Sequence, residues 1–312
     1  MKGKDILTMF GFDVQEEPQS IYAFSPVYHV KNETGDIIIK RTQSLLKHGN
    51  QLMNFINLLN QSGISVVSPI SLPVENPQLI GDETFVAYPF ITGKTYTSTK
   101  EEIFEAGRLL GRIHDFSPSR NTFDLLKYDV FDFNKEEVEE SVQNIEKYSK
   151  KNGVQINSLL LKEKLLKAVS QQNELKNSSL PWVATPHDYK ANNLIFTPAP
   201  YLIDPDNASW IPRIFDLALA LLLFHNELES APKRIFTLEE WSAFISGYGE
   251  VITLTELEKE YWEKALEHVF LDEVMWLMAE VEEDWFNPSQ QKLFVSLIEF
   301  MTSPFDKYKL AF

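Results

Sequence analysis

Two short apolar runs with polar residues at their ends constrain this chain of 312 residues more than any other feature. The segment PHDYKANNLIF covers residues 186–196, and YLIDPDN follows at residues 201–207. The runs NLIF and YLI are typical of short strands, and the short connection between them predicts a hairpin. Such a hairpin would place Asn193, before the first strand, next to Asp204, at the end of the second.

These polar residues suit the chemistry of phosphoryl transfer. Mg²⁺ prefers carboxylate and carbonyl oxygens together with phosphate, so Asn193 and Asp204 are candidate metal ligands. Asp188 precedes Asn193 by five residues and could accept a proton from a substrate hydroxyl. Phosphoryl transfer depends mainly on positioning and charge neutralisation, which such a set of residues can supply. The alternative interpretation is that all three are polar turn residues next to short strands.

The composition excludes several other classes of site. The chain has no cysteine, which excludes disulfides, thiolate metal sites and a cysteine nucleophile. No apolar run reaches the ~18 residues that a membrane-spanning helix needs. The N-terminal MKGKDILTMFGF lacks the apolar core of a signal peptide. We therefore expect a cytoplasmic protein that has no membrane partner.

The charge is strongly negative and unevenly spread. The formal net charge is −16, and residues 216–312 contain 19 Asp and Glu against 7 Lys and Arg. This distribution disfavours nucleic acid, which is bound largely by basic side chains, and favours a cationic partner. A well-solvated acidic helical surface is the alternative interpretation. The sequence carries no signal for an oligomeric state.

The first part of the chain has the pattern of a small sheet with one helix. Its strand-like runs are SIYAF, PVYHV, DIIIKRT, SVVSPISL and ETFVAYPFI. KNETGD, between the second and third runs, predicts a hairpin turn, and residues 43–62 have the apolar spacing of a helix. We predict that this β-rich domain covers residues 1–93.

Helical patterns dominate the rest, which we predict to be a second domain of residues 94–312. Its first helix begins with the capping pair Thr99 and Glu102. Gly107 and Gly111, four residues apart, would let another backbone approach one face of this helix. Residues 133–175 and nearly everything after residue 215 also have helical patterns. The fold class is therefore α+β with two lobes.

In its motifs the chain resembles the aminoglycoside phosphotransferase and choline kinase family, whose fold is bilobal and protein-kinase-like. Asp188 and Asn193 keep the D-x-x-x-x-N spacing of the family's catalytic loop, LID ends at the metal aspartate Asp204, and DLALAL matches a helix start at Asp216. The segments EAGRLLGRIHDF, GDIIIKRT and VAYPFITGKTY resemble the family's helix after the hinge, its lysine strand and its hinge. The combination, over residues 20–225, is specific, whereas each motif alone is common.

The resemblance implies ATP and Mg²⁺ as cofactors and assigns a role to individual residues. Asp188 would be the catalytic base, with Lys190 near the γ-phosphate. Asn193 and Asp204 would hold the metal, and Asp216 would support the loop through hydrogen bonds. The nucleotide would be bound by the phosphate ligand Lys40, by Ser25 of the phosphate loop AFSPVYHV, and by the hinge residues Tyr88, Phe90 and Ile91.

The chain departs from the family pattern at three places. The family has a histidine two residues before the catalytic aspartate, where this chain has Pro186 and places His187 adjacent to Asp188. The phosphate loop contains no glycine. The helix at 43–62 contains no acidic residue, so Gln51 or Asn54 would have to orient Lys40 in place of the usual glutamate.

The prediction is an ATP- and Mg²⁺-dependent kinase that transfers the γ-phosphate to a hydroxyl of a small molecule. We hypothesise a cationic acceptor, aminoglycoside-like or an amino alcohol, bound by acidic residues and Trp276 through ion pairing and cation–π contact. A core helix with a solvated acidic face is the alternative for that region. The candidate carboxylates are Glu227, Glu229, Asp272, Glu273, Glu280, Glu282, Glu283 and Asp284.

Two other functions remain open at this point. A catalytically weak, kinase-like nucleotide-binding module would fit the missing glycines and the missing helix glutamate. A protein kinase is disfavoured, because the chain between Asp204 and Asp216 is too short for an activation segment.

Overall fold

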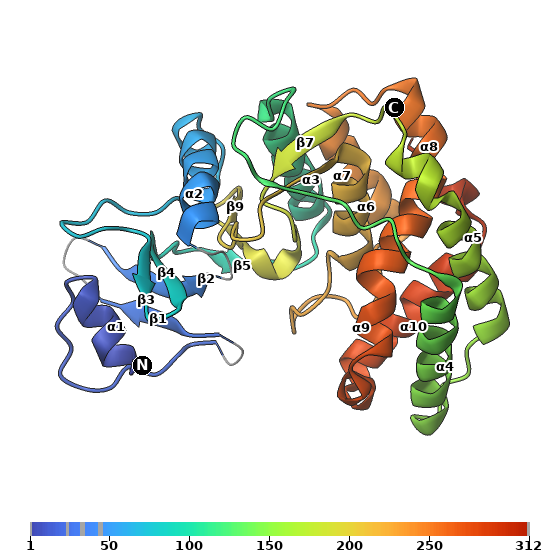
Figure 1. Cartoon of the computed structure of the whole chain (residues 1–312), viewed down its shortest axis with the longest axis horizontal. Coiled ribbons are helices and arrows are strands. Elements are labelled where there is room, and N and C mark those ends of the chain that lie inside the picture. Colours follow the sequence, from blue (N-terminus) through green and yellow to red (C-terminus); the bar gives the residue numbers. More distant parts are fainter. Residues whose placement is uncertain (1, 23–24, 32–34, 43–45, 311–312) are drawn as a thin grey trace.

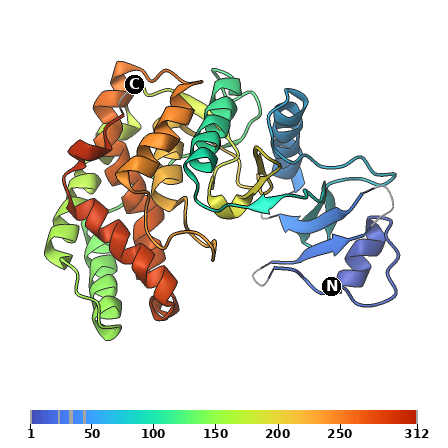
Figure 2. The same cartoon turned by 180° about the vertical axis from the view of Figure 1, so that it is seen from behind.

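A computed structural model describes residues 2–22, 25–31, 35–42 and 46–310 of the chain. A small part built around a sheet lies at one end of the molecule, and a larger bundle of helices lies at the other (Figures 1 and 2). Short strands and the loops around them lie between the two parts. The predicted α+β architecture, with a β-rich N-terminal part and a helical C-terminal part, is confirmed.

The N-terminal sheet is antiparallel with the strand order β1-β2-β4-β3. Its strands are β1 (Val27–Val30), β2 (Ile37–Thr42), β3 (Gln78–Ile80) and β4 (Glu83–Pro89). One face packs against helix α1 (Gly3–Met9), which the sequence patterns did not predict, and buries Ile39 and Phe85 there. Helix α2 (Leu46–Gln61) packs against the opposite face, where Val86 and Tyr88 are buried with the apolar residues of that helix.

The pleat of this sheet sets the direction of the Lys40 side chain. Successive strand residues point to opposite faces, so Lys40 lies opposite to its buried neighbour Ile39. The register pairs Lys40 with Val86 and Ile38 with Tyr88. Lys40 and Tyr88 are therefore diagonal neighbours on the face that carries α2.

Several of the predicted N-terminal elements need correction. The hairpin between PVYHV and DIIIKRT is confirmed by the pairing of β1 with β2, although residues 32–34 of its turn lie outside the described residues. SVVSPISL is not a strand and makes only an isolated bridge between Val66 and Leu202, because Pro69 cannot donate to a ladder. In SIYAF, residues 21 and 22 form a bend, and residues 23–24 lie outside the described part of the chain.

The C-terminal part contains eight α-helices among its described residues. They are α3 (Lys100–Phe116), α4 (Lys135–Lys151), α5 (Ser158–Lys176), α6 (Arg213–Leu223), α7 (Leu238–Gly249), α8 (Glu256–Val269), α9 (Met275–Ala279) and α10 (Pro288–Thr302). A π-helical turn, Phe270–Val274, joins α8 to α9, and the 3-10 turns Glu282–Phe286 and Phe305–Tyr308 flank α10. The capping box of Thr99 and Glu102 is present at α3. No helix of the described residues is long and apolar enough to cross a membrane.

Two small sheets connect these parts. One has the order β5-β8-β9, with β5 (Lys94–Thr95), β8 (Leu194–Phe196) and β9 (Pro200–Leu202). The other has the order β6-β10-β7, with β6 (Leu126–Lys127), β7 (Trp182–Thr185) and β10 (Ser209–Pro212). Because β8 pairs with β9 in an antiparallel register, the hairpin predicted from NLIF and YLI is confirmed.

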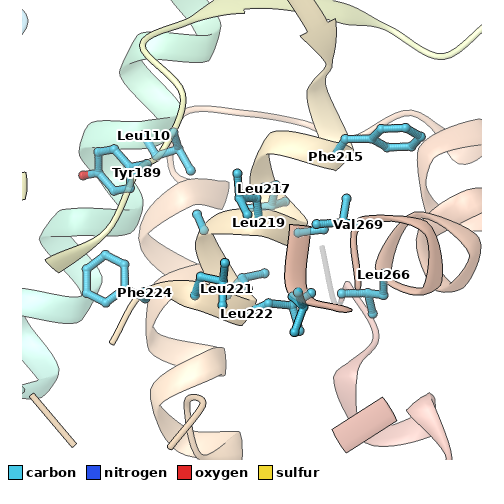
Figure 3. Close-up of a cluster of buried hydrophobic side chains, with 14 of the residues drawn as sticks. Leu110, Tyr189, Phe215, Leu217, Leu219, Leu221, Leu222, Phe224, Leu266 and Val269 are labelled. Atoms are coloured by element: carbon cyan, nitrogen blue, oxygen red, sulfur yellow. The ribbon is translucent and has the colours of Figure 1, made fainter. Parts of the chain in front are cut away.

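Helix α6 lies at the centre of the helical part. Every residue from Ile214 to Leu223 is buried, and all of them except Asp216 are apolar. Figure 3 shows Leu217, Leu219, Leu221 and Leu222 of this helix between Leu110 of α3 and Leu266 and Val269 of α8. A helix that is apolar on all sides is stable only inside a core, so α6 is a fixed support for the residues at its N-terminus.

Helices α3 and α7 approach each other unusually closely, as the glycine pair of the sequence predicted. A Cβ added to Gly107 would lie 2.0 Å from the carbonyl oxygen of Phe244, and one added to Gly247 would lie 1.9 Å from that of Phe104. At Gly111 the corresponding distance, to the Tyr248 carbonyl oxygen, is 3.0 Å. Backbone atoms cannot move aside as a side chain can, so glycine is required at positions 107 and 247.

We predict that Gly247→Ala lowers the free energy of unfolding by about 3 kcal/mol or more, because overpacking against a backbone forces the two helices apart. Gly49→Ala in α2 is the matched control, since its Cβ would meet only the Thr84 methyl group at 3.9 Å. In a helix interior that change should raise stability by up to ~1 kcal/mol. Urea denaturation measures both, and equal effects of the two substitutions would contradict the packing argument.

Candidate active site

The catalytic loop runs from the end of β7 to the start of β8. It includes the single 3-10 turn Ala191–Asn193. His187 and Asp188 both have left-handed backbones, with φ of 57° and 48°. Such conformations are unfavourable for residues other than glycine and occur mainly where the surrounding structure enforces them. The loop must therefore be held by specific contacts.

Asp216 provides those contacts from the first turn of α6. Its buried carboxylate accepts hydrogen bonds from Thr185 Oγ1 at 3.0 Å, from His114 Nε2 at 2.9 Å and from His187 Nδ1 at 2.9 Å. Burial alone would raise the pKa of Asp216, but the hydrogen bonds and charges of the two histidines outweigh it and hold that pKa well below its usual range. The carboxylate thus stays ionised and ties α3, β7 and the catalytic loop to α6. The supporting role predicted for Asp216 agrees with this geometry.

His187 lies between two carboxylates. Its Nδ1 donates to Asp216, and its Nε2 is 3.6 Å from Glu273 Oε1. Burial would lower the pKa of His187, but the interactions with Asp216 and Glu273 outweigh it and raise that pKa to about 10. The imidazolium therefore connects the catalytic loop to the π-helical turn. Nothing in the sequence pattern around His187 indicated Glu273 as its partner.

Asp188 shares a compact charge cluster with Lys190 and Glu227. Lys190 Nζ lies 3.0 Å from Asp188 Oδ2 and 2.9 Å from Glu227 Oε1. Lys190 is buried, whereas the Asp188 side chain is about one third exposed, at 36%. Burial raises the pKa of Asp188, and the ammonium group of Lys190 opposes that effect. The two residues predicted as catalytic are thus adjacent, with the carboxylate accessible to a substrate.

The β8–β9 hairpin brings Asn193, just before β8, near Asp204, which follows β9. The Ile203 N–H donates to the Asn193 carbonyl oxygen at 2.9 Å, which places Asp204 one residue beyond that pair. The Asn193 side-chain amide donates to the Asp188 carbonyl oxygen at 3.0 Å. Asn193 therefore connects the loop that carries Asp188 to the hairpin, and its side-chain amide oxygen is an atom of the kind that binds Mg²⁺.

Lys40 reaches this hairpin from the N-terminal sheet. Its ammonium group pairs with Asp204 Oδ1 and lies 3.0 Å from Asp206 Oδ2. The Tyr88 hydroxyl donates to Asp206 Oδ1 at 2.7 Å. The expectation that Gln51 or Asn54 orients Lys40 is wrong, because Gln51 donates to Asp124 and Asn54 is exposed.

The carboxylates at this site fit a bound divalent cation. Lys40 pairs with Asp204 and Asp206, and Lys190 pairs with Asp188 and Glu227, so carboxylates outnumber ammonium groups in these ion pairs. Among the described residues, however, no three histidine, aspartate or glutamate side chains are grouped to hold a metal ion alone. Asn193 and Asp204 would therefore supply only part of a coordination shell. Mg²⁺ usually takes its other ligands from phosphates and water.

Some atoms of the predicted nucleotide-binding residues already form hydrogen bonds within the protein. The Ser25 carbonyl oxygen accepts from Ser20 Oγ at 3.1 Å. The Phe90 N–H donates to the Asp36 carbonyl oxygen at 2.8 Å, so this N–H is already occupied. The Tyr88 side chain is buried at the rear of the site, and Ile91 packs against the main core. Nucleotide contacts by Ser25, Tyr88, Phe90 and Ile91 stay predictions.

On the side of the catalytic loop away from Lys40, two adjacent carboxylates lie on the π-helical turn. Asp272 accepts a hydrogen bond from the Tyr128 hydroxyl at 2.7 Å, and Glu273 lies beside His187. Burial and the neighbouring Glu273 raise the pKa of Asp272 to about 6. π-Helical turns often occur at functional sites. Of the eight carboxylates proposed from the sequence, Glu273 and Glu227 contact the loop residues His187 and Lys190.

The matching family model is described as "Phosphotransferase enzyme family" and covers residues 22–250. The chain belongs to this family. The predicted family and the predicted phosphotransferase class are thereby confirmed, and the matched region contains the whole loop and hairpin described above. A comparison with curated proteins finds no match.

Solved structures of the family share the fold over nearly the whole chain. A microcompartment-associated aminopropanol kinase has a TM-score of 0.67 at 14% identity, with 96% of this chain and 94% of that chain covered. The spectinomycin phosphotransferase APH(9)-Ia, in complex with ADP and spectinomycin, has a TM-score of 0.58 at 17% identity over 96% of each chain. The choline kinase LicA from Streptococcus pneumoniae has a TM-score of 0.54 at 16% identity, covering 91% and 92%.

We predict that stability depends on His187 most strongly at neutral and mildly acidic pH. A histidine with a raised pKa in the folded state stabilises fully below its unfolded pKa of about 6.5 and loses this effect as the pH rises through about 10. The difference in unfolding free energy between the native protein and His187→Gln should therefore shrink between pH 6.5 and 10, by at most about 1.4 kcal/mol per pH unit. Urea denaturation across this range measures it, and a constant difference would contradict the assigned charge.

Proposed function

We propose that the chain is an ATP- and Mg²⁺-dependent kinase that phosphorylates a hydroxyl group of a small molecule. The observation that carries this proposal is the meeting of Asp188, Asn193 and Asp204 with Lys40, a residue from the opposite part of the chain. The family and the folds of the three solved structures support it. The cytoplasmic location expected from the sequence stays a prediction.

The nucleotide would lie between an N-terminal lobe of residues 1–93 and a C-terminal lobe of residues 94–312, the division predicted from the sequence. The chain passes from one lobe to the other at Gly93. The packing there is tight, because a Cβ on Gly93 would lie 2.5 Å from the Phe196 carbonyl oxygen of β8. Lys40 would bind the phosphates, and Tyr88, Phe90 and Ile91 would line the adenine side. Asn193 and Asp204 would hold Mg²⁺, which when bound neutralises charge on the phosphates.

Asp188 would act as the general base. As the acceptor oxygen attacks the γ-phosphorus and the bond to the ADP oxygen breaks, the carboxylate takes the hydroxyl proton. Its raised pKa improves it as a proton acceptor. Lys190, 3.0 Å from the same carboxylate, would orient it and approach the transferred phosphoryl group.

The acceptor would carry an amine. The two adjacent carboxylates Asp272 and Glu273 lie beyond the base, and among the described residues their nearest cationic group is His187. Trp276, three residues after Glu273 and 46% exposed, would offer an aromatic surface to the amine. Neighbours whose names specify aminopropanol, choline and spectinomycin support a small acceptor of this kind.

Asp188→Asn should lower turnover by at least ~10²-fold, since general bases contribute about 10²–10⁴, while ATP still binds. Asp129→Asn is the matched control, because Asp129 forms an exposed ion pair with Lys176 at 2.9 Å, far along the chain from the site motifs. ADP release across amine and sugar acceptors measures turnover, and calorimetry measures ATP binding.

The two measurements together decide between the functions considered. Turnover that survives in Asp188→Asn would remove Asp188 from its role as the base. ATP binding by the native protein without turnover on any acceptor would favour the nucleotide-binding module instead.

We predict that Glu273→Gln and Asp272→Asn each raise KM for an amine-bearing acceptor about tenfold, and change KM for a neutral alcohol little, because an ion pair to a partly buried carboxylate is worth ~1.4 kcal/mol or more. Asp272 has a pKa of about 6, so the affinity of the amine should fall as the pH drops below 6 and this carboxyl becomes protonated. Glu280→Gln is the control, because Glu280 is exposed at the C-cap of α9.

A thermal-shift panel gives an independent readout of acceptor class. Amines should raise Tm and neutral alcohols should not. The reverse result would contradict a cationic acceptor without affecting the proposed phosphotransferase chemistry.

A further inference from the structure

Lys40 is surrounded by an unusual set of partners for a phosphate-binding lysine. In protein kinases such a lysine is held by a glutamate of the neighbouring helix, and the position of that helix controls the pair. Helix α2 has no acidic residue between Leu46 and Gln61. The sulfur of the buried Met53 on α2 lies 3.6 Å from the Tyr88 hydroxyl oxygen.

Asp206, on the loop after β9, supplies Lys40 with a carboxylate partner that α2 does not provide. Its Oδ2 lies 3.0 Å from Lys40 Nζ, and its Oδ1 accepts from the Tyr88 hydroxyl at 2.7 Å. The side chains of Lys40 and Asp206 are only 10% and 7% exposed. A buried ion pair is tolerated when both members are paired and further hydrogen-bonded, and Tyr88 supplies that further bond.

The two aspartates that face Lys40 differ in accessibility. Asp204 is 44% exposed, against 7% for Asp206, although only one residue separates them. Asp204 is therefore the more accessible of the two to a bound cation, and Lys40 would still be paired with Asp206 if Asp204 turned away. Asp206 cannot follow it, because Tyr88 fixes its other oxygen. Lys40 would then keep one carboxylate partner throughout.

We propose that Asp206, fixed by Tyr88, is the positioning residue that replaces the helix glutamate for Lys40. This inference rests on the proposed function, since it assumes that Lys40 binds nucleotide phosphates. It also implies that the position of Lys40 is set by the loop after β9 and by β4, and not by α2. Movement of α2 would then leave the ion pair intact, unlike in kinases whose helix carries the glutamate.

The test uses Asp206→Asn, Tyr88→Phe, Met53→Glu and the double variant Asp206→Asn with Met53→Glu, all in the full chain. Calorimetry with ATP and with adenosine separates phosphate binding from base binding. We expect Asp206→Asn to weaken ATP binding about tenfold or more (~1.4 kcal/mol), because Lys40 loses the buried carboxylate that holds it in position. Adenosine, which has no phosphate, should bind as before.

The other variants distinguish positioning from alternatives. Tyr88→Phe should weaken ATP binding in the same direction but less. The double variant should bind ATP within about threefold (~0.7 kcal/mol) of the native protein, because Glu at position 53 restores a carboxylate beside Lys40 on α2. Met53→Glu alone should lower Tm, because it adds an excess buried carboxylate to the cluster.

Three results would overturn the inference. ATP affinity unchanged in Asp206→Asn would remove Asp206 from any role toward Lys40. Equal loss of ATP and adenosine affinity would show a purely structural role. Recovery of Asp206→Asn by excess Mg²⁺, but not by Met53→Glu in a folded double variant, would identify Asp206 as a metal ligand instead. In each case ATP binding and turnover of the native protein would still support the kinase, whereas their absence would contradict the proposed function itself.

Discussion

The buried carboxylate of Asp216 is the interaction on which the candidate site depends. It is the single charged side chain of the buried core of α6, and a charge inside a core is unfavourable unless hydrogen bonds satisfy it. The donors come from three separate places: His114 on α3, Thr185 at the end of β7 and His187 on the catalytic loop. These elements can pack around α6 only in an arrangement that brings all three donors to one point. The left-handed backbones of His187 and Asp188, unfavourable in isolation, are a consequence of that requirement.

Two clusters of charged side chains lie next to this loop. Toward the N-terminal sheet, Lys40 meets Asp204 and Asp206, and toward the helices, Lys190 joins Asp188 to Glu227. In both clusters carboxylates outnumber ammonium groups, so a bound cation and a cationic acceptor would both relieve repulsion. The uneven charge of the sequence, concentrated after residue 216, therefore has a local counterpart at the site. The π-helical turn adds Asp272 and Glu273 to the same side.

Much of the architecture could be predicted because local patterns decide it. The hairpin β8–β9, the capping box at α3 and the close approach permitted by Gly107 and Gly111 all depend on a few neighbouring residues or on one helical face. The errors have equally local causes. SVVSPISL has the composition of a strand, but Pro69 prevents the ladder. Helix α1 was not predicted: its seven residues are too few for a clear helical period, and it is stable because Ile6, Leu7 and Phe10 pack on the sheet.

By itself the sequence determined which residues could do chemistry: the spacing of Asp188 and Asn193, the aspartate after a short strand, and the absence of an acid in α2. Only the tertiary structure decided which of them meet. Lys40 and Asp204 are 164 residues apart, and Tyr128 and Asp272 are 144 apart. The periods of helices and strands relate residues a few positions apart, whereas these pairs depend on how whole elements pack around α6. For that reason the partner of Lys40 proved to be on a loop far along the chain and not on the adjacent helix.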